Sequence, residues 1–210
     1  MNTRVEVILG CMYSGKSTEL IRRINRYESI GKNILLINHT KDVRTDNNVS
    51  THSNQKKNAK KTEFLSDLIH SLEFTKADVI GIDEAQFFTD LYDFIVQIEK
   101  FNKIVIVAGL DGDYQRKPIG QILNIIPLSD SVIKLTALDM ETKDGSLAIF
   151  TKRLVNSNQQ ILVGSTDEYM AVSRGNYLKN NEAINNDNLV TDRLSQVLDS
   201  IESFDQQVFY

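Results

Sequence analysis

The chain has 210 residues, of which 41% are hydrophobic and 25% charged, and its formal net charge is -4 at pH 7. These values predict a packed globular core and exclude global disorder. The acidic balance argues against a nucleic-acid-binding protein, because such proteins usually carry a surplus of Lys and Arg. We interpret the one basic cluster, KKNAKK at residues 56–61, as a solvated loop or helix end.

No feature of the sequence indicates a membrane protein or an exported one. The chain has no apolar run of about 18 residues, the length of a membrane span. Its first residues, MNTRVEVILG, lead into a strand-like segment without a basic-then-apolar export signal. The single cysteine, Cys11, excludes an intramolecular disulfide and an all-cysteine metal site within one chain. We therefore expect a cytoplasmic protein that binds neither membranes nor nucleic acid.

Apolar runs alternate with helical patterns along the first two thirds of the chain. Strands are predicted at residues 5–9, 33–38, 103–112 and 131–138 and within residues 77–88. Helical spacing occurs at residues 17–29, in FLSDLIHSL (64–72) and in LYDFIVQIEKF (91–101). This alternation predicts an α/β fold in which helices cover both faces of a parallel sheet. Ligands of such sheets bind at the carboxyl ends of the strands.

The first predicted strand leads directly into GCMYSGKS, residues 10–17, which fits the phosphate-binding loop G-x-x-x-x-G-K-[ST]. Gly10 and Gly15 allow backbone N–H groups to face phosphate oxygens. Lys16 places a positive charge against the β- and γ-phosphates, and the Ser17 hydroxyl is a Mg²⁺ ligand. We interpret the Cys11 side chain as a packing residue. The loop and the alternation together predict a phosphate-loop, RecA-like sheet.

A pair of acids, Asp83 and Glu84, follows the predicted strand within residues 77–88. Phosphate-loop proteins hold Mg²⁺ with an Asp at the end of a buried strand, and Asp83 fits that place. Glu84 is then a candidate general base, which would activate either a substrate hydroxyl or a water molecule. From these residues alone, a kinase and an ATP hydrolase both remain open.

The alternation fades after about residue 138. Residues 139–177 look like a small hairpin-and-loop unit, LKNNEAINNDN is an Asn-rich linker, and apolar residues near the end have the spacing of a short amphipathic helix. We therefore predict an ATP-binding core at 1–137, a second subdomain at 138–178, and a linker with a helix at 179–210.

Read together, GCMYSGKSTELIRR, STH, IGIDEAQFF, GLDGDYQRKPIG, KLTAL, FTKR, ILVG and EYMAVSRGNY resemble the type II thymidine kinases over residues 5–177. The resemblance implies transfer of the ATP γ-phosphate to the 5′-hydroxyl of thymidine or deoxyuridine. It implies that residues 138–178 form a lasso that closes over the base. It also implies inhibition by dTTP and a homotetramer.

The resemblance assigns a role to each site residue. Glu84 and Lys16 would be catalytic, and Ser17 and Asp83 would organise Mg²⁺. ATP and its phosphates would be held by Gly10, Cys11, Met12, Tyr13, Ser14, Gly15, Lys16, Ser17, Asp83 and Gln86. The nucleoside would be held by Met12, Phe87, Leu110, Tyr114, Thr151, Tyr169 and the lasso backbone at Gln160, Ile161, Leu162, Val163 and Gly164.

Three departures from the family pattern stand out. The positions of the family's four zinc-binding cysteines hold Asp139, Thr142, Ser173 and Asn176, so we predict no structural zinc and a lasso held by hydrogen bonds, packing or a partner subunit. Ser53 stands where the family commonly has Asp. The segment from KDG to FTKR is also slightly longer than usual.

Two other readings of the chain remain beside the nucleoside kinase. An ATP-hydrolysing switch or motor of the same fold would hydrolyse ATP without a nucleoside, but it would have no evident use for a pyrimidine lid. A degenerate regulator that binds nucleotides without turnover is suggested by Ser53 and the lost cysteines. The intact Lys16 and Glu84 argue against it.

Overall fold

The computed structural model of this protein describes residues 3–42, 48–50, 56–155 and 167–179. The chain divides into two compact units, Met1–Ser173 and Arg174–Tyr210. All elements named below belong to the first unit. None of the helices in the described ranges is long and apolar enough to cross a membrane. The predicted amphipathic helix near the end of the chain lies outside the described residues.

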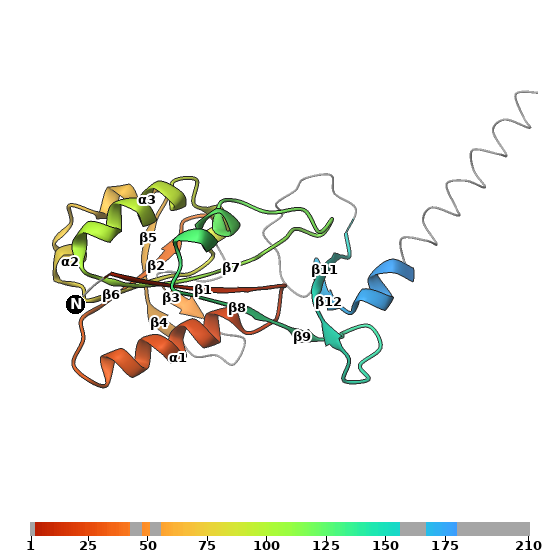
Figure 1. Ribbon diagram of the computed structural model, residues 1–210. Helices are drawn as coiled ribbons and strands as arrows, with labels where there is room; N and C mark the ends of the chain where they lie inside the picture. Colours follow the sequence, from red (N-terminus) through yellow and green to blue (C-terminus); the bar gives the residue numbers. More distant parts are fainter. Residues whose placement is uncertain (1–2, 43–47, 51–55, 156–166, 180–210) are drawn as a thin grey trace, which may run out of the picture. The chain divides into compact units, whose positions relative to one another are not determined.

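A six-stranded parallel sheet forms the middle layer, in the order β5-β2-β6-β7-β1-β8 (Figure 1). Its strands are β1 (Arg4–Gly10), β2 (Ile34–His39), β5 (Lys60–Thr62), β6 (Val79–Ile82), β7 (Ile104–Gly109) and β8 (Ser131–Leu135). The central strands β6 and β7 are buried along their whole length, which is typical of parallel strands covered on both faces. The predicted α/β phosphate-loop fold is confirmed.

Helices cover both faces of this sheet (Figure 1). On one face α1 (Lys16–Glu28) buries Leu20, Ile21 and Ile24 beside the short hairpin of β3 (Asn48–Ser50) and β4 (Lys56–Asn58). α2 (Leu72–Lys76), α3 (Leu91–Ile98) and the 3-10 turn Ile122–Leu128 pack on the other face. Gly81 permits the close approach of α1, since a Cβ there would lie 2.4 Å from Ile24 Cδ1.

Two local predictions were wrong. The pattern at residues 64–72 forms a 3-10 turn, Ser66–Leu68, and not a continuous helix. The reason is Ser71, which adopts an extended backbone and accepts a hydrogen bond from Phe74 N, so that a new helix begins at Leu72. The basic cluster at 56–61 is not a helix end, because it contributes to β4 and β5.

Beyond the sheet the chain forms two small antiparallel hairpins, as the sequence indicated. The first joins β9 (Ala137–Leu138) to β10 (Leu147–Ala148). The second joins β11 (Phe150–Arg153) to β12 (Tyr169–Val172). Residues 156–166, between β11 and β12, are not among the described residues.

Candidate active site

The phosphate-binding loop connects β1 to α1, at the carboxyl edge of the sheet. Tyr13 and Gly15 have positive φ angles of 63° and 83°, which turn the loop around the start of the helix. The carbonyl oxygen of Cys11 accepts hydrogen bonds from Ser14 Oγ at 2.9 Å and from Lys16 Nζ at 2.7 Å. The first bond of the helix runs from Glu19 N to the Gly15 carbonyl, so the backbone N–H groups before it at the start of α1 are available to an anion. The Cys11 side chain is buried beside alanines, which fits its interpretation as a packing residue.

Two hydrogen bonds tie this loop to the second hairpin. Met12 N donates to Thr151 Oγ1 at 3.0 Å, and Tyr13 Oη donates to the Tyr169 carbonyl at 3.1 Å. Thr151 lies on β11 opposite Ala171, and Tyr169 lies on β12 opposite Arg153, so the two residues are two positions apart in the register of this hairpin. Two of the residues predicted to bind the nucleoside, Thr151 and Tyr169, are thus brought against the predicted phosphate loop.

The acid pair lies beside the loop. Asp83 is buried at the end of β6, and burial, followed by the charge of Glu84, raises the pKa of its carboxyl group. A hydrogen bond from the Ser17 side chain acts in the opposite direction on that pKa. The two predicted magnesium ligands, Ser17 and Asp83, are therefore in direct contact.

Glu84 occupies a left-handed backbone conformation, with φ 51° and ψ 40°. Such a conformation is uncommon for a residue other than glycine and is often found at functional sites. Gln86 fixes the Glu84 side chain: its Nε2 donates to Glu84 Oε2 at 2.6 Å, while its Oε1 accepts from Leu110 N at 3.0 Å. Gln86 thereby connects the acid to the end of β7.

The backbone of Gln86 is itself closely packed. Gly120 has a φ of +58°, and a Cβ at this position would lie 2.2 Å from the Gln86 carbonyl oxygen. Only glycine fits there without moving the Gln86 backbone. The position of the acid pair therefore depends on a glycine 36 residues away from Glu84 in the chain.

Lys16 lies in the field of several carboxylates. Burial lowers the pKa of its ammonium group, and the charges of Glu84, Asp83 and Asp111 act in the opposite direction. Asp111 follows β7 and pairs with Lys134 at 2.5 Å. Sequence reasoning did not single out Asp111, although it stands in the quoted motif GLDGDYQRKPIG.

Arg153 is a second residue that the sequence reasoning missed. Its guanidinium group lies 3.8 Å from the centre of the Tyr114 ring and 5.3 Å from that of Tyr169. Its Nη2 also donates to Tyr169 Oη at 2.7 Å. Arg153 therefore joins two of the predicted nucleoside-binding residues, and its presence in the motif FTKR was the available signal.

The remaining predicted residues are placed as follows. Phe87 is half-buried after β6, with its ring centre 5.7 Å from that of His39. Leu110 is half-buried at the end of β7. Ser53 and the segment from Gln160 to Gly164 lie outside the described residues.

One buried carboxylate connects the two hairpins. Asp139 Oδ1 accepts hydrogen bonds from the backbone N–H groups of Glu141 and Thr142 at 2.8 and 2.9 Å, and from Thr142 Oγ1 at 3.3 Å. Its Oδ2 accepts from Ser173 N at 2.5 Å, at the end of β12. Asp139 is 2% exposed. Thr142 and Ser173, two of the positions where the resemblance places zinc cysteines, are therefore hydrogen-bonded to the carboxylate of a third, Asp139.

The residues fit a magnesium ion that is bound with a nucleotide. The described ranges contain no group of three or more His, Cys, Asp or Glu side chains that could hold a metal ion by themselves. Protein Mg²⁺ sites commonly use only one or two carboxylates and complete the coordination with substrate phosphates and water. Asp83 with Ser17 beside the phosphate loop provides such a partial site.

Comparison with known proteins identifies the family. The family model described as thymidine kinase matches residues 3–177. The cytosolic thymidine kinases of Cricetulus griseus and Homo sapiens are each 43% identical to this chain over 84% of its length and 74% of theirs. The thymidine kinase of Vaccinia virus strain Western Reserve is 42% identical over 83% of this chain and 96% of its own. A solved DNA replication initiation factor matches 67% of this chain and 42% of its own with a TM-score of only 0.39 and 11% identity. The chain belongs to the thymidine kinase family.

Proposed function

We propose that the protein transfers the γ-phosphate of ATP to the 5′-hydroxyl of thymidine, and also of deoxyuridine. The observation that carries this proposal is the placement of Glu84, which Gln86 holds in a left-handed turn beside Asp83 and the phosphate loop. A carboxylate held in this way can accept a proton from an attacking hydroxyl. Membership of the thymidine kinase family supports the choice of nucleoside.

In this mechanism each residue of the loop and the acid pair has one task. The loop N–H groups and Lys16 hold the phosphate chain, and Lys16 exchanges its bond to the Cys11 carbonyl for one to a phosphate oxygen. Asp83 and Ser17 hold Mg²⁺, which supplies positive charge against the phosphate oxygens when bound. Glu84 accepts the proton of the attacking 5′-hydroxyl, and Gln86 keeps the Glu84 side chain in position.

The hairpins supply the nucleoside side of the site. Thr151 and Tyr169 are bonded to the phosphate loop, so a nucleoside held by them would lie next to the transferred phosphate. Met12, Phe87, Leu110 and Tyr114 would enclose the base. Excluding water from this enclosure favours transfer to the nucleoside over hydrolysis.

Several finer expectations belong to the same proposal. Residues 138–178 would act as a lasso subdomain whose backbone at 160–164 contacts the pyrimidine, beside a core at 1–137. The lasso would work without zinc. We also propose a cytoplasmic homotetramer inhibited by dTTP; light scattering of the purified protein and a dTTP titration of turnover test these two points.

The decisive experiment measures ADP production from ATP and Mg²⁺, with and without thymidine. We expect ADP to form only with thymidine, and the Glu84→Gln variant to lose about 10²- to 10⁴-fold in kcat, the usual contribution of a general base. Glu99→Gln is the matched control, because it removes the charge of an exposed Glu outside the site. It should turn over like the wild type.

Two outcomes would contradict the proposal and favour another function. ADP formed at the same rate without thymidine would assign the protein to the ATP-hydrolysing class. Nucleotide binding without turnover under either condition would identify a degenerate regulator.

A further inference from the structure

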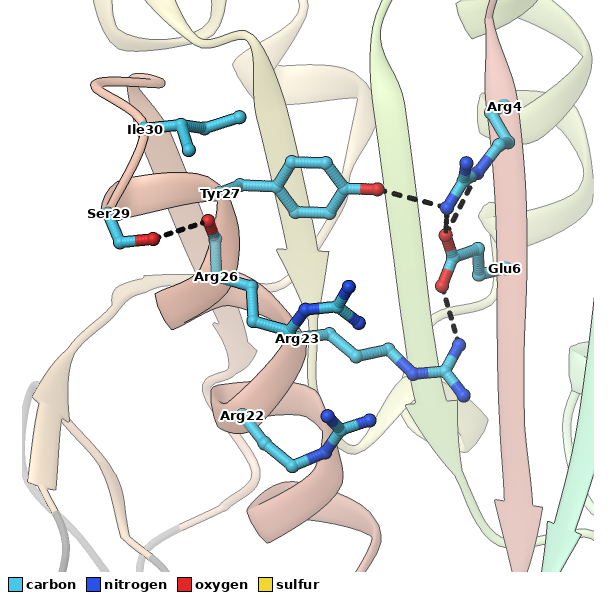
Figure 2. A pocket seen from close by; sticks show the side chains of 8 residues that line it. All are labelled: Arg4, Glu6, Arg22, Arg23, Arg26, Tyr27, Ser29 and Ile30. Atoms are coloured by element: carbon cyan, nitrogen blue, oxygen red, sulfur yellow. Dashed lines mark hydrogen bonds and ion pairs between the residues drawn. The ribbon is translucent and has the colours of Figure 1, made fainter.

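A groove lies between the last turns of α1 and the start of β1, away from the candidate active site (Figure 2). Its volume is about 610 Å³, and Arg4, Arg22, Arg23, Arg26, Tyr27 and Ile30 contribute to its lining. The phosphate loop begins at the other end of the same strand, six residues beyond Arg4. At about 3.3 Å per residue this separates the groove from the loop by about 20 Å.

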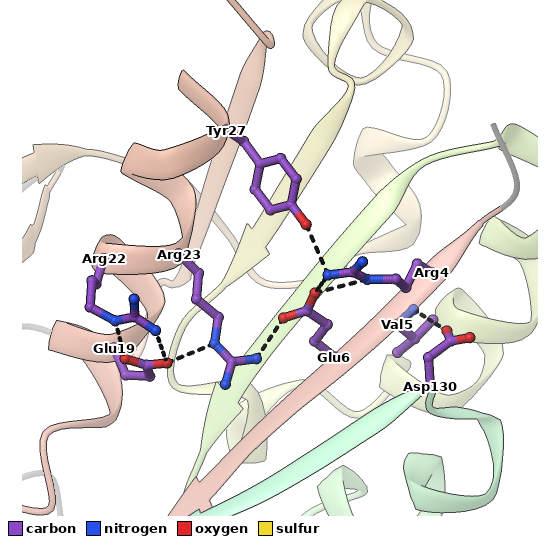
Figure 3. A network of polar contacts seen from close by, with 8 residues as sticks. All are labelled: Arg4, Val5, Glu6, Glu19, Arg22, Arg23, Tyr27 and Asp130. Atoms are coloured by element: carbon purple, nitrogen blue, oxygen red, sulfur yellow. Dashed lines mark hydrogen bonds and ion pairs between the residues drawn. The ribbon is translucent and has the colours of Figure 1, made fainter. Parts of the chain in front are cut away.

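Two carboxylates, Glu6 in the groove lining and Glu19 beside it, are each bound by more than one arginine (Figure 3). Glu6 accepts from Arg4 Nε at 2.9 Å and from Arg23 Nη1 at 2.5 Å. Glu19 accepts from Arg22 Nε and Nη2 at 2.6 and 2.8 Å and from Arg23 Nε at 2.8 Å. The hydrogen bond from Arg22, ahead of that from Arg23, lowers the pKa of Glu19 to about 2, so it is ionised at neutral pH.

These bonds fix the arginines without using all their donors. Each guanidinium has five N–H donors, and those of Arg4, Arg22 and Arg23 donate only two or three bonds each to protein acceptors. The side chains of Arg4 and Arg22 are 51% and 55% exposed. The remaining N–H groups of Arg4 and Arg22 are therefore accessible while their guanidinium planes stay in place, whereas the Arg23 side chain is largely buried.

The groove also carries uncompensated positive charge. Four arginines and Glu6 line the groove, and Glu19, outside the lining, bonds Arg22 and Arg23; against these two carboxylates the four arginines leave an excess of two positive charges. Within the described part of the chain, the guanidinium of Arg26 makes no hydrogen bond or ion pair. Arg22 and Arg26 are four residues apart on the helix, a spacing at which like charges repel. Glu19 compensates Arg22 but is not bonded to Arg26 among the described residues.

Other acids near the groove do not remove this excess. Glu28 pairs with Lys57 at 2.6 Å, beside the β3–β4 hairpin. Asp130 is not part of the groove lining, and its Oδ2 accepts from Val5 N at 2.7 Å (Figure 3), but its charge still acts on Arg4 and lowers the excess to one positive charge. Arg26 lies in the last turn of α1, where its positive charge interacts favourably with the helix dipole. That effect explains one arginine there and not four around one groove.

We propose that this groove binds the phosphate groups of a small phosphorylated ligand, at a site separate from the phosphate loop. Planar guanidinium groups bind phosphate through paired N–H donors, and preorganised arginines lose little freedom when they do so. Tyr27 and the exposed Ile30 border the groove and offer apolar surface to the rest of such a ligand. The size of the groove is that of common small-molecule sites.

Isothermal titration with inorganic tripolyphosphate tests the proposal. The wild type should bind two molecules per chain, one at the phosphate loop and one in the groove. Lys16→Ala should weaken the first site and leave the second. Arg26→Gln should weaken the second site about threefold or more, and Arg22→Gln with Arg26→Gln about tenfold or more, because charge-assisted hydrogen bonds are lost.

The control removes two positive charges elsewhere. Lys76→Gln with Lys100→Gln alters two exposed lysines on and after the helices of the opposite sheet face and should leave both sites unchanged. Thymidine turnover of the Arg22→Gln, Arg26→Gln variant should also remain unchanged, which separates this proposal from that of the kinase activity. A similar affinity for orthophosphate would assign the groove to a single phosphate group, and tighter tripolyphosphate binding would assign it to a phosphate chain.

Three results would overturn the proposal. The first is a single tripolyphosphate per chain that is lost in Lys16→Ala. The second is a second site whose affinity is unchanged in both groove variants. The third is displacement by sulfate at equal concentration, which would show a site for anions in general and not for phosphate.

Discussion

Asp139 should determine how firmly the two hairpins are held. In Asp139→Ala the backbone N–H groups of Glu141, Thr142 and Ser173 lose their acceptor. A hydrogen bond to a charged group contributes about 1.5–3 kcal/mol, and partial access of water to these N–H groups reduces the loss. We therefore expect unfolding to become easier by about 2–4 kcal/mol. Asp139→Asn keeps one oxygen for the turn at Glu141 and Thr142 but presents an NH₂ group to Ser173 N. Its free energy of unfolding should therefore fall by about half as much as that of Asp139→Ala.

The depressed pKa of Asp139 determines how its contribution to stability changes with pH. Hydrogen bonds from the backbone of Ser173 and Thr142 outweigh burial, and the pKa of Asp139 is held below its usual value. For a carboxyl whose pKa is depressed by folding, the stabilisation is complete above the unfolded pKa of about 3.9 and is lost as pH falls through the folded value. The stability difference between the wild type and Asp139→Asn should thus stay constant from pH 8 to about pH 5 and shrink only below about pH 4.

Urea denaturation of the wild type and both variants across this pH range checks the expected stabilities. The KM for thymidine measures whether the loosened hairpins also weaken substrate binding. Because Ser173 follows β12, loosening it should raise KM for thymidine more than it lowers kcat. Asp93→Asn is the control, since it removes the charge of an exposed Asp on α3 and leaves both hairpins untouched. An unchanged stability in Asp139→Ala, or a stability gap that varies between pH 5 and pH 8, would refute the reasoning.

The remaining predictions concern the acid pair, the arginine between the two tyrosines, and zinc. Gln86→Leu removes the hydrogen bond to the Glu84 side chain, so kcat should fall at least tenfold with little change in KM for ATP. A kcat equal to that of the wild type would show that Glu84 does not need this hydrogen bond. Gly120→Ala places a Cβ against the Gln86 carbonyl at a positive φ and should destabilise the protein by about 2 kcal/mol or more in thermal unfolding. Arg153→Met retains apolar bulk but loses the bond to Tyr169, and should raise KM for thymidine about tenfold while KM for ATP stays constant. Elemental analysis of the purified protein should find far less than one zinc per chain; one tightly held ion would contradict the prediction.

The sequence was sufficient to place those candidate-site residues that are neighbours in the chain. The loop from Gly10 to Ser17 needs only its own glycines and the strand and helix that flank it, and both flanking elements have clear apolar patterns. Asp83 and Glu84 follow a buried strand directly, so their place at the sheet edge follows from parallel topology. The helix expected at residues 64–72 failed for an equally local reason, because Ser71 caps a new helix there.

Tertiary structure decided the rest, because the partners are far apart in the chain. The bond from Gln86 to Leu110, the stacking of Arg153 on Tyr114, and the bond from Asp139 to Ser173 join residues 24 to 39 positions apart. The arginine groove likewise needs β1 beside α1 before its charges gather on one surface. No spacing rule along the sequence specifies such contacts, since they depend on the path of the chain between the two partners and on how the elements pack.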